Sequence, residues 1–222
     1  MKKSLIVAAL VLIGVAGSVR AVSENGFTLN VLHDGEPVKE IIEGDVRRTA
    51  IPFGSEYAVR LRNTNGRRCV AKVSIDGAPV SKMGNFVLVA DGVLDLERFL
   101  DASLTDGSKF KFVSLDHPDV DDPGRAENGL IEVEFRLEKE RPPVEFYYYE
   151  GPYIITNEWH DGIRIWDTTP IDCSATSYSC SSATLPGATV EGGKSDQAFR
   201  AVSFEAGDEV VVLRLQLRGI ME

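Results

Sequence analysis

The stretch that decides the fold is residues 56–75, which reads EYAVRLRN-TNG-RRCVAKVSI. Apolar and polar residues alternate through 56–63 and again through 68–75, the pattern of strands with one buried face. Asn65-Gly66 lies between them, and this dipeptide favours a tight connection between two antiparallel strands. The stretch therefore predicts a β-hairpin.

The register of this hairpin follows from its apolar residues, because a slip of one residue would turn every side chain to the opposite face. A three-residue loop over 64–66 collects the apolar side chains on one face and leaves the arginines on the other. It pairs Leu61 with Cys69, Val59 with Ala71 and Tyr57 with Val73, opposite Arg60, Arg62 and Arg68. Cys69 is then a buried free thiol that packs as a small apolar side chain.

The rest of the chain also shows short alternating segments separated by turn residues. No long amphipathic helix is predicted. The predicted strands are 27–31, 86–90, 93–96, 109–113, 129–137 and two after residue 197, the last with Val211, Leu213, Leu215 and Leu217 on one face. We predict an all-β fold, an antiparallel two-sheet sandwich of jelly-roll type with a β-rich C-terminal extension.

The N-terminal residues predict export. Lys2 and Lys3 precede an apolar run over 5–16, and small residues end it, with Val19 and Ala21 where signal peptidase selects its site. This is the pattern of a cleaved signal peptide, and the run is too short to span a bilayer. We therefore expect a secreted or periplasmic protein that begins at Val22.

The mature chain is strongly acidic. The whole chain carries −10, and removal of residues 1–21 takes away Lys2, Lys3 and Arg20 but no acidic residue, so the mature form is three charges more negative. Such a surface repels phosphate backbones and anionic lipids. Nucleic-acid partners and an integral membrane location are therefore not expected.

Two further features suggest how the mature chain is organised. Pro142-Pro143 predicts a boundary, which divides it into a sandwich domain at 22–140 and a β-rich part at 141–222 packed against it. That second part contains a long Ser/Thr/Gly-rich loop over about 167–197. In an oxidising compartment Cys173 and Cys180, six residues apart within this loop, predict a local disulfide.

An acidic loop is the candidate metal site. Residues 116–124 read DHPDVDDPG, and carboxylate oxygens in an irregular loop can hold Ca²⁺. The candidate ligands are Asp116, Asp119, Asp121 and Asp122. The spacing does not fit an EF-hand, and a solvated acidic loop is the alternative; no other cofactor is indicated.

An aromatic segment is the candidate ligand surface. Residues 157–166 read NEWHDGIRIW, and Asp161-Gly162 favours a tight hairpin that sets Trp159 opposite Arg164. An exposed face of this kind can bind a sugar ring or a partner protein, whereas a buried one only packs the domain. The candidate residues are Trp159, Arg164, Trp166, Tyr147 and Tyr149.

Enzyme signatures are absent from the sequence, which has no H-E-x-x-H, no G-x-S-x-G and no P-loop. Glu132 and Glu134 lie on one face of a predicted strand and resemble the acid pair of a glycosidase, although such acids commonly serve only solvation. A secreted polysaccharide hydrolase is therefore the alternative to a non-catalytic module.

Several segments match motifs that recur together. They are Gly54-Ser55-Glu56-Tyr57 with 59–63, Val73-Ser74-Ile75-Asp76-Gly77 with Val80, Lys109-Phe110-Lys111-Phe112, 129–135, and 201–205 with Leu213-Arg214 and Gly219-Ile220. Through G-x-E-Y-x-V-R-L-x-N and V-S-I-D-G the chain resembles a group of uncharacterised bacterial secreted β-rich proteins. The resemblance implies export and a β fold, and it carries over no activity.

Together these features predict a non-catalytic structural or interaction module at or outside the cell surface. Its expected partners are other protein subunits, including copies of itself, or a surface glycan. The apolar strand 209–217 is the segment expected to pair with the sheet edge of a neighbour.

Overall fold

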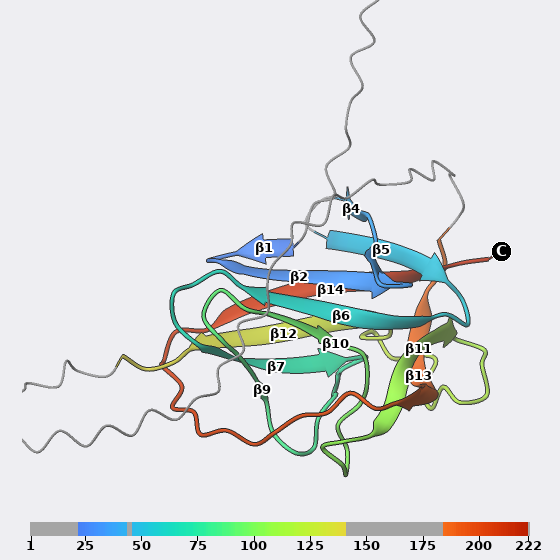
Figure 1. The fold of residues 1–222 in the computed structure, drawn as a ribbon. Coiled ribbons are helices and arrows are strands. Elements are labelled where there is room, and N and C mark those ends of the chain that lie inside the picture. Colours follow the sequence, from blue (N-terminus) through green and yellow to red (C-terminus); the bar gives the residue numbers. More distant parts are fainter. Residues whose placement is uncertain (1–21, 44–45, 141–183, 222) are drawn as a thin grey trace, which may run out of the picture. The chain divides into compact units, whose positions relative to one another are not determined.

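A computed structural model describes residues 22–43, 46–140 and 184–221, with the side chain of Glu43 left out. One compact unit comprises Met1–Lys139 and Ala183–Glu222, and a second comprises Glu140–Ser182. The described residues form fourteen strands and no helix (Figure 1). The predicted all-β, two-sheet arrangement is confirmed.

The first sheet has the order β1-β2-β6-β11-β13, with β3 beside β2 and β10 beside β6. Its pairings are all antiparallel. Its strands are β1 (Val22–Glu24), β2 (Phe27–His33), β3 (Glu36–Pro37), β6 (Glu56–Asn63), β10 (Val93–Leu96), β11 (Gly107–Ser114) and β13 (Gly187–Ser195).

The second sheet has the order β4-β5-β14-β12-β7-β8, with β9 also beside β7. Its one parallel pairing joins β14 to β5. Its strands are β4 (Glu40–Glu43), β5 (Val46–Pro52), β7 (Cys69–Ile75), β8 (Ala78–Pro79), β9 (Phe86–Leu88), β12 (Leu130–Leu137) and β14 (Val211–Ile220).

The core is made from the alternating faces of these strands. In β12 Ile131, Val133 and Phe135 are buried, and in β14 Val211, Leu213, Leu215 and Leu217 are buried, as the period of two predicts. Aromatic residues of the two sheets meet between them, where Phe27 of β2 stacks on Phe135 with ring centroids 4.5 Å apart. Burial of these side chains from both sheets holds the unit together.

The predicted hairpin over 56–75 is wrong, although both of its strands exist. β6 pairs with β2, β10 and β11, whereas β7 pairs with β12, β8 and β9. The connection crosses from one sheet to the other, so the apolar faces of β6 and β7 point at each other across the core. Alternation fixes the face that a strand buries, and a hairpin and a crossing connection both satisfy it.

A buried amide fixes this crossing. Asn63 is fully buried, and its Nδ2 donates to the carbonyl oxygens of Arg67 at 2.8 Å and Val89 at 2.9 Å. The chain near Val89 is itself a second crossing, from β9 to β10. One side chain therefore satisfies backbone groups of both loops, as a buried polar residue must.

The C-terminal strands are part of the sandwich rather than an extension packed on it. β13 occupies 187–195, within the predicted loop, and forms the edge of the first sheet beside β11. Residues 196–210 contain no strand, only an isolated bridge between Ala206 and Glu138. β14 lies between β5 and β12 in the order of the second sheet, and it pairs with β12 over residues 211–216 and with β5 over residues 216–220. Pairing of 209–217 with another molecule stays a prediction.

Candidate functional site

The predicted aromatic surface lies outside the described residues. This applies to Tyr147, Tyr149, Trp159, Arg164 and Trp166, and equally to Cys173 and Cys180 with their predicted disulfide. The ligand surface and the disulfide stay predictions. The signal peptide at 1–21 also lies outside the described residues.

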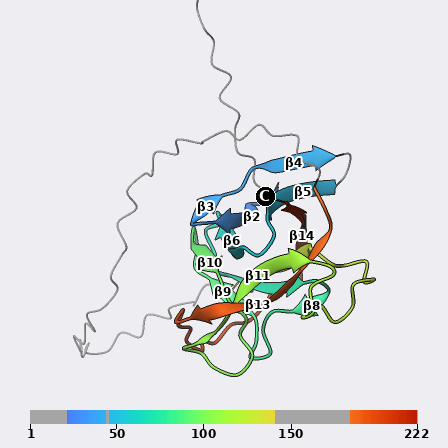
Figure 2. The same ribbon diagram turned by 90° about the vertical axis from the view of Figure 1, so that its right-hand side faces the viewer.

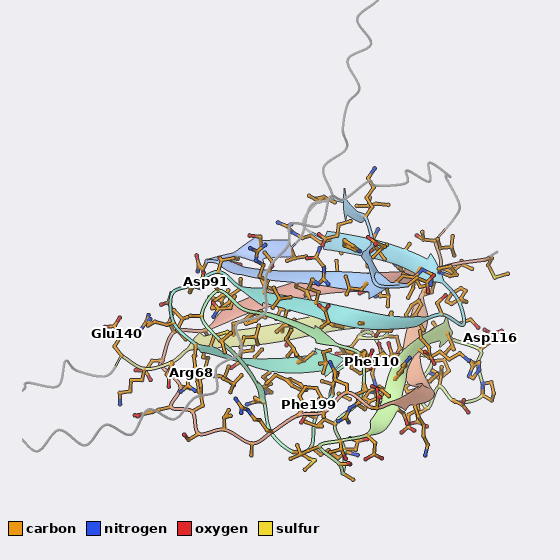
Figure 3. All side chains as sticks on the ribbon, viewed as in Figure 1. Arg68, Asp91, Phe110, Asp116, Glu140 and Phe199 are labelled. Carbon is orange, nitrogen blue, oxygen red and sulfur yellow. The ribbon has the colours of Figure 1, made fainter. Side chains whose placement is uncertain are left out.

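The acidic loop follows β11 at the opposite end of the unit from Arg68 and Asp91 (Figure 3). A hydrogen bond from Ser114 lowers the pKa of Asp116, Asp119 Oδ2 lies 3.7 Å from His117 Nδ1, and Asp122 Oδ2 lies 4.0 Å from Arg125 Nε. In the described part of the chain, no three His, Cys, Asp or Glu side chains form a group that could hold a metal ion. Calcium binding by Asp116, Asp119, Asp121 and Asp122 stays a hypothesis, which titration of the protein with Ca²⁺ would test.

The candidate glycosidase pair lies on the outer face of β12. Glu132 Oε2 is 2.6 Å from Arg214 Nε, and Glu134 Oε1 is 2.6 Å from Arg136 Nη2. Each carboxylate is thus bound to its own arginine on a polar sheet face.

Cys69 is a buried free thiol, as predicted. Burial raises its pKa to about 12. A thiol that stays protonated at neutral pH is a weak nucleophile, so Cys69 contributes packing rather than chemistry.

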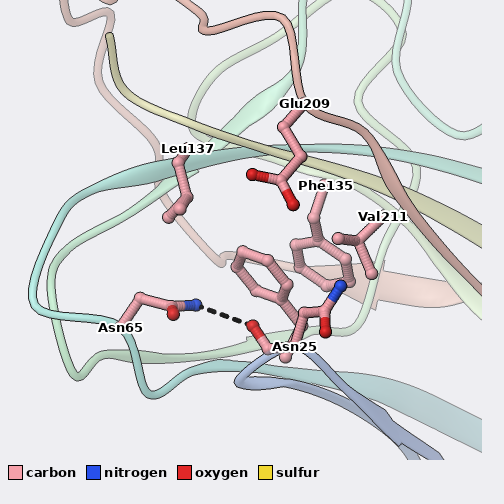
Figure 4. A pocket seen from close by; sticks show the side chains of 7 residues that line it. Asn25, Asn65, Phe135, Leu137, Glu209 and Val211 are labelled. Carbon is pink, nitrogen blue, oxygen red and sulfur yellow. Dashed lines mark hydrogen bonds between the residues drawn. The ribbon is translucent and has the colours of Figure 1, made fainter. Parts of the chain in front are cut away.

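A small pocket of about 170 Å³ opens beside the loop that carries Asn65 (Figure 4). Its lining residues are Asn25, Phe27, Asn65, Phe135, Leu137, Glu209 and Val211. Asn65 donates from Nδ2 to the Asn25 carbonyl at 3.2 Å, and the two phenyl rings stack on each other. The Asn65 amide and the rings therefore serve the fold, which leaves the Glu209 carboxylate and the Asn25 side-chain amide as polar groups that line the pocket.

Arg98 is a buried charge that the sequence did not single out. It is fully buried, and its guanidinium donates to the carbonyl oxygens of Asp106 at 2.7 Å, Gln197 at 2.8 Å and Phe99 at 3.0 Å. It also lies over the ring of Phe199, 5.1 Å from the centroid. These contacts hold the 97–106 loop against the chain after β13, which is a structural role.

Asp76 is a buried carboxylate in the turn after β7. Its two oxygens accept the backbone N–H groups of Gly129 and Thr189, each at 2.6 Å. Burial raises its pKa to about 6, and the two N–H donors oppose that rise. Because Thr189 belongs to β13, this carboxylate joins the second sheet to the first.

Glu40 is a second buried carboxylate that joins the two sheets. It begins β4, and its Oε1 accepts the N–H of Val22 in β1 at 3.1 Å. Oε2 is buried and has no hydrogen-bond partner among the described residues. Burial raises the pKa of Glu40 to about 7, against the lowering effects of the Val22 N–H and of Arg47.

β4 itself is an open sheet edge. It pairs with β5 on one side, and no described strand pairs with its other side; Figure 2 shows it outermost. Ile41 is 49% exposed and Ile42 is 50% exposed. Successive residues of a strand point to opposite faces, so this edge presents an apolar side chain on each face.

No family model, curated protein or solved structure matches this chain. No helix among the described residues is long and apolar enough to cross a membrane. The candidate site therefore rests on geometry alone, and its elements are the β4 edge and the Glu40 side chain that begins this strand.

Proposed function

We propose that this chain is exported and acts as a non-catalytic interaction module that binds another polypeptide by strand addition along β4. The observation that supports the proposal is the open edge with Ile41 and Ile42 exposed on its two faces. In strand addition, main-chain hydrogen bonds provide affinity and alternate side chains provide contact area.

Comparison with the other edges strengthens this proposal. Folded proteins protect sheet edges with proline, lysine or very short strands. Here β3 contains Pro37, β8 contains Pro79, β13 contains Lys194, and β1 and β9 have three residues each, whereas β4 has two successive isoleucines. An unprotected apolar edge is an aggregation hazard unless a partner covers it.

A second copy of the chain is the partner that the β4 pattern favours. Antiparallel pairing of two β4 strands about a two-fold axis can set Ile41 of one copy opposite Ile41 of the other, or Ile42 opposite Ile42, which is a self-complementary contact. The Glu40 carboxylate is turned into the molecule, toward Val22, and so does not add repulsion across this contact.

Light scattering after size-exclusion chromatography tests the proposal on the chain that begins at Val22. We expect the mass to rise from monomer toward dimer with concentration, and Ile42→Lys to restore the monomer by placing charge in the contact. Val202→Lys is the matched control, since Val202 is 47% exposed and lies outside the β strands. A monomer at every concentration, or an equal effect of both variants, would reject pairing through β4.

The aromatic segment is a second surface in the same functional class. We keep the glycan-binding hypothesis for Trp159, Arg164 and Trp166, with Tyr147 and Tyr149 beside them, because exposed aromatic and arginine side chains dominate binding energy. A glycan panel probed with the mature chain and with Trp159→Ala tests it. The polysaccharide hydrolase has less support, since Glu132 and Glu134 are each bound to an arginine.

A further inference from the structure

The contact between Val22 and Glu40 is incomplete. Val22 is 5% exposed and Glu40 is 8% exposed, so the contact is shielded from water. One N–H reaches Oε1 at 3.1 Å, and Oε2 lacks a hydrogen-bond partner among the described residues. A buried carboxylate without full hydrogen bonding costs stability, and the raised pKa of Glu40 reflects the same cost.

The position of this nitrogen in the sequence is informative. Val22 is the residue that follows the predicted cleavage site at Ala21. While residues 1–21 are attached, the Val22 nitrogen is an amide with one proton and no charge. Hydrolysis adds water across the Ala21–Val22 bond: the carboxyl group leaves with Ala21, and the amine that remains on Val22 takes up a proton to become an ammonium.

We propose that signal-peptide cleavage supplies the partner that Glu40 lacks, because it converts the Val22 nitrogen into an α-ammonium that forms a buried ion pair with the Glu40 carboxylate. This inference rests on the proposed export and on cleavage after Ala21. The ammonium has three donors where the amide has one, so both carboxylate oxygens can be satisfied. Charge-assisted hydrogen bonds are about twice as strong as neutral ones.

The fold gives this pair a mechanical consequence. Val22 pairs with Leu29 at the edge of the first sheet, and Glu40 pairs with Thr49 at the edge of the second. The ion pair therefore fastens the two sheets together beside β4, the proposed docking edge. The precursor lacks this ion pair, so the folded precursor is less stable than the folded chain after cleavage.

Other charges near Glu40 limit the pH range of the pair. Arg47 and Arg48 follow on the paired strand β5, and the exposed Lys39 precedes Glu40 in the chain. Of these, Arg47 lowers the pKa of Glu40 and so favours the ionised carboxylate, against the larger raising effect of burial. The pair requires an ionised Glu40 carboxylate and a protonated α-amine, and each of these charges favours the other.

A double-mutant cycle tests the proposal. One chain begins at Val22 and the other begins at Ala21, which moves the same charge by one residue, about 3.5 Å. Each is made with Glu40 and with Glu40→Gln. We expect the Val22 chain to melt about 5 °C higher than the Ala21 chain, and this difference to disappear with Glu40→Gln.

The matched control is Glu36→Gln, which removes an exposed carboxylate from β3 close in sequence. It should leave the 5 °C difference intact. Equal melting temperatures of the Val22 and Ala21 chains, or a difference that survives Glu40→Gln, would overturn the proposal.

A second measurement does not depend on a folded Glu40 variant. Reductive methylation of the α-amine at neutral pH should be about tenfold slower in the Val22 chain than in the Ala21 chain, since a buried ion-paired amine is rarely free. Equal rates would contradict the ion pair. N-terminal sequencing of the exported protein tests the cleavage site separately, and light scattering tests β4, so each proposal can fail without the others.

Discussion

Two buried carboxylates join the sheets of this protein, and they differ in how completely they are bound. Asp76 accepts two backbone N–H groups at 2.6 Å, one on each oxygen. Glu40 accepts one N–H at 3.1 Å and leaves Oε2 buried without a hydrogen bond among the described residues. Both carry a raised pKa because burial outweighs their donors.

The difference follows from what each carboxylate faces. Asp76 faces backbone amides of Gly129 and Thr189, which the folded chain holds in place once the sheets assemble. Glu40 faces the Val22 nitrogen, whose charge depends on covalent processing. Folding alone can therefore complete the first contact, whereas in our proposal cleavage after Ala21 completes the second.

The largest effect is expected for Asp76→Ala, which leaves the N–H groups of Gly129 and Thr189 buried without acceptors. We expect a loss of about 3 kcal/mol in the free energy of unfolding, measured by urea denaturation at an unchanged m-value. Asp91→Ala is the control, because Asp91 is exposed and its φ of 52° is nearly the same as the 53° of Asp76. The Asp91→Ala variant measures only the cost of placing alanine in the left-handed backbone conformation, about 1 kcal/mol. An equal loss in both variants would mean that Asp76 contributes only its backbone conformation.

A smaller effect is expected from pH, in a chain that retains Ala21. The native pKa values of Asp76, about 6, and Glu40, about 7, exceed the ordinary values of these side chains, 3.8 and 4.5. The native state then binds more protons than the unfolded chain between these limits, so stability falls as pH rises from 4.5 to 7. We expect a fall of about 2 kcal/mol between pH 5 and pH 6 alone, where both carboxylates contribute, measured by urea denaturation at each pH.

Two variants separate the contributions to this pH profile. Glu40→Gln should remove the part of the fall that ends near pH 7, and Asp76→Asn the part that ends near pH 6. Groups with a lowered pKa, such as Glu56 beside the Gly193 N–H, act in the opposite direction at lower pH. A stability that rises between pH 4.5 and 7 would show that the donors outweigh burial at both carboxylates.

The smallest effect is expected for Tyr57→Phe. The Tyr57 hydroxyl lies 2.8 Å from Thr189 Oγ1, on the residue whose N–H binds Asp76. Because the variant removes one buried hydrogen bond and keeps the Asp76 contact, we expect a loss of about 1 kcal/mol by urea denaturation. A loss as large as that of Asp76→Ala would mean that the tyrosine, rather than the carboxylate, holds β13 in place.

The sequence could predict local structure because its signals are local. The alternation in β6, β7, β12 and β14 identifies the buried face of each strand, and Asp76-Gly77 marks a turn in which both residues have positive φ. The sequence did not predict β13, because glycine-rich segments such as the one with Gly192 and Gly193 lack the apolar–polar alternation that marks a strand. The candidate site was missed for a related reason: Glu40 is an isolated acid beside two isoleucines, with no motif around it.

The amino-acid sequence by itself determined that the described chain is all-β and which side chains form its core, since a period of two specifies a buried face without reference to distant residues. Tertiary structure alone decided which strands pair, that residues 64–68 cross between sheets, and that β14 lies inside a sheet. It also brought Val22 to Glu40 and Thr189 to Asp76. These contacts join residues distant in the chain, and the packing of two apolar faces selects them after each strand has its own pattern.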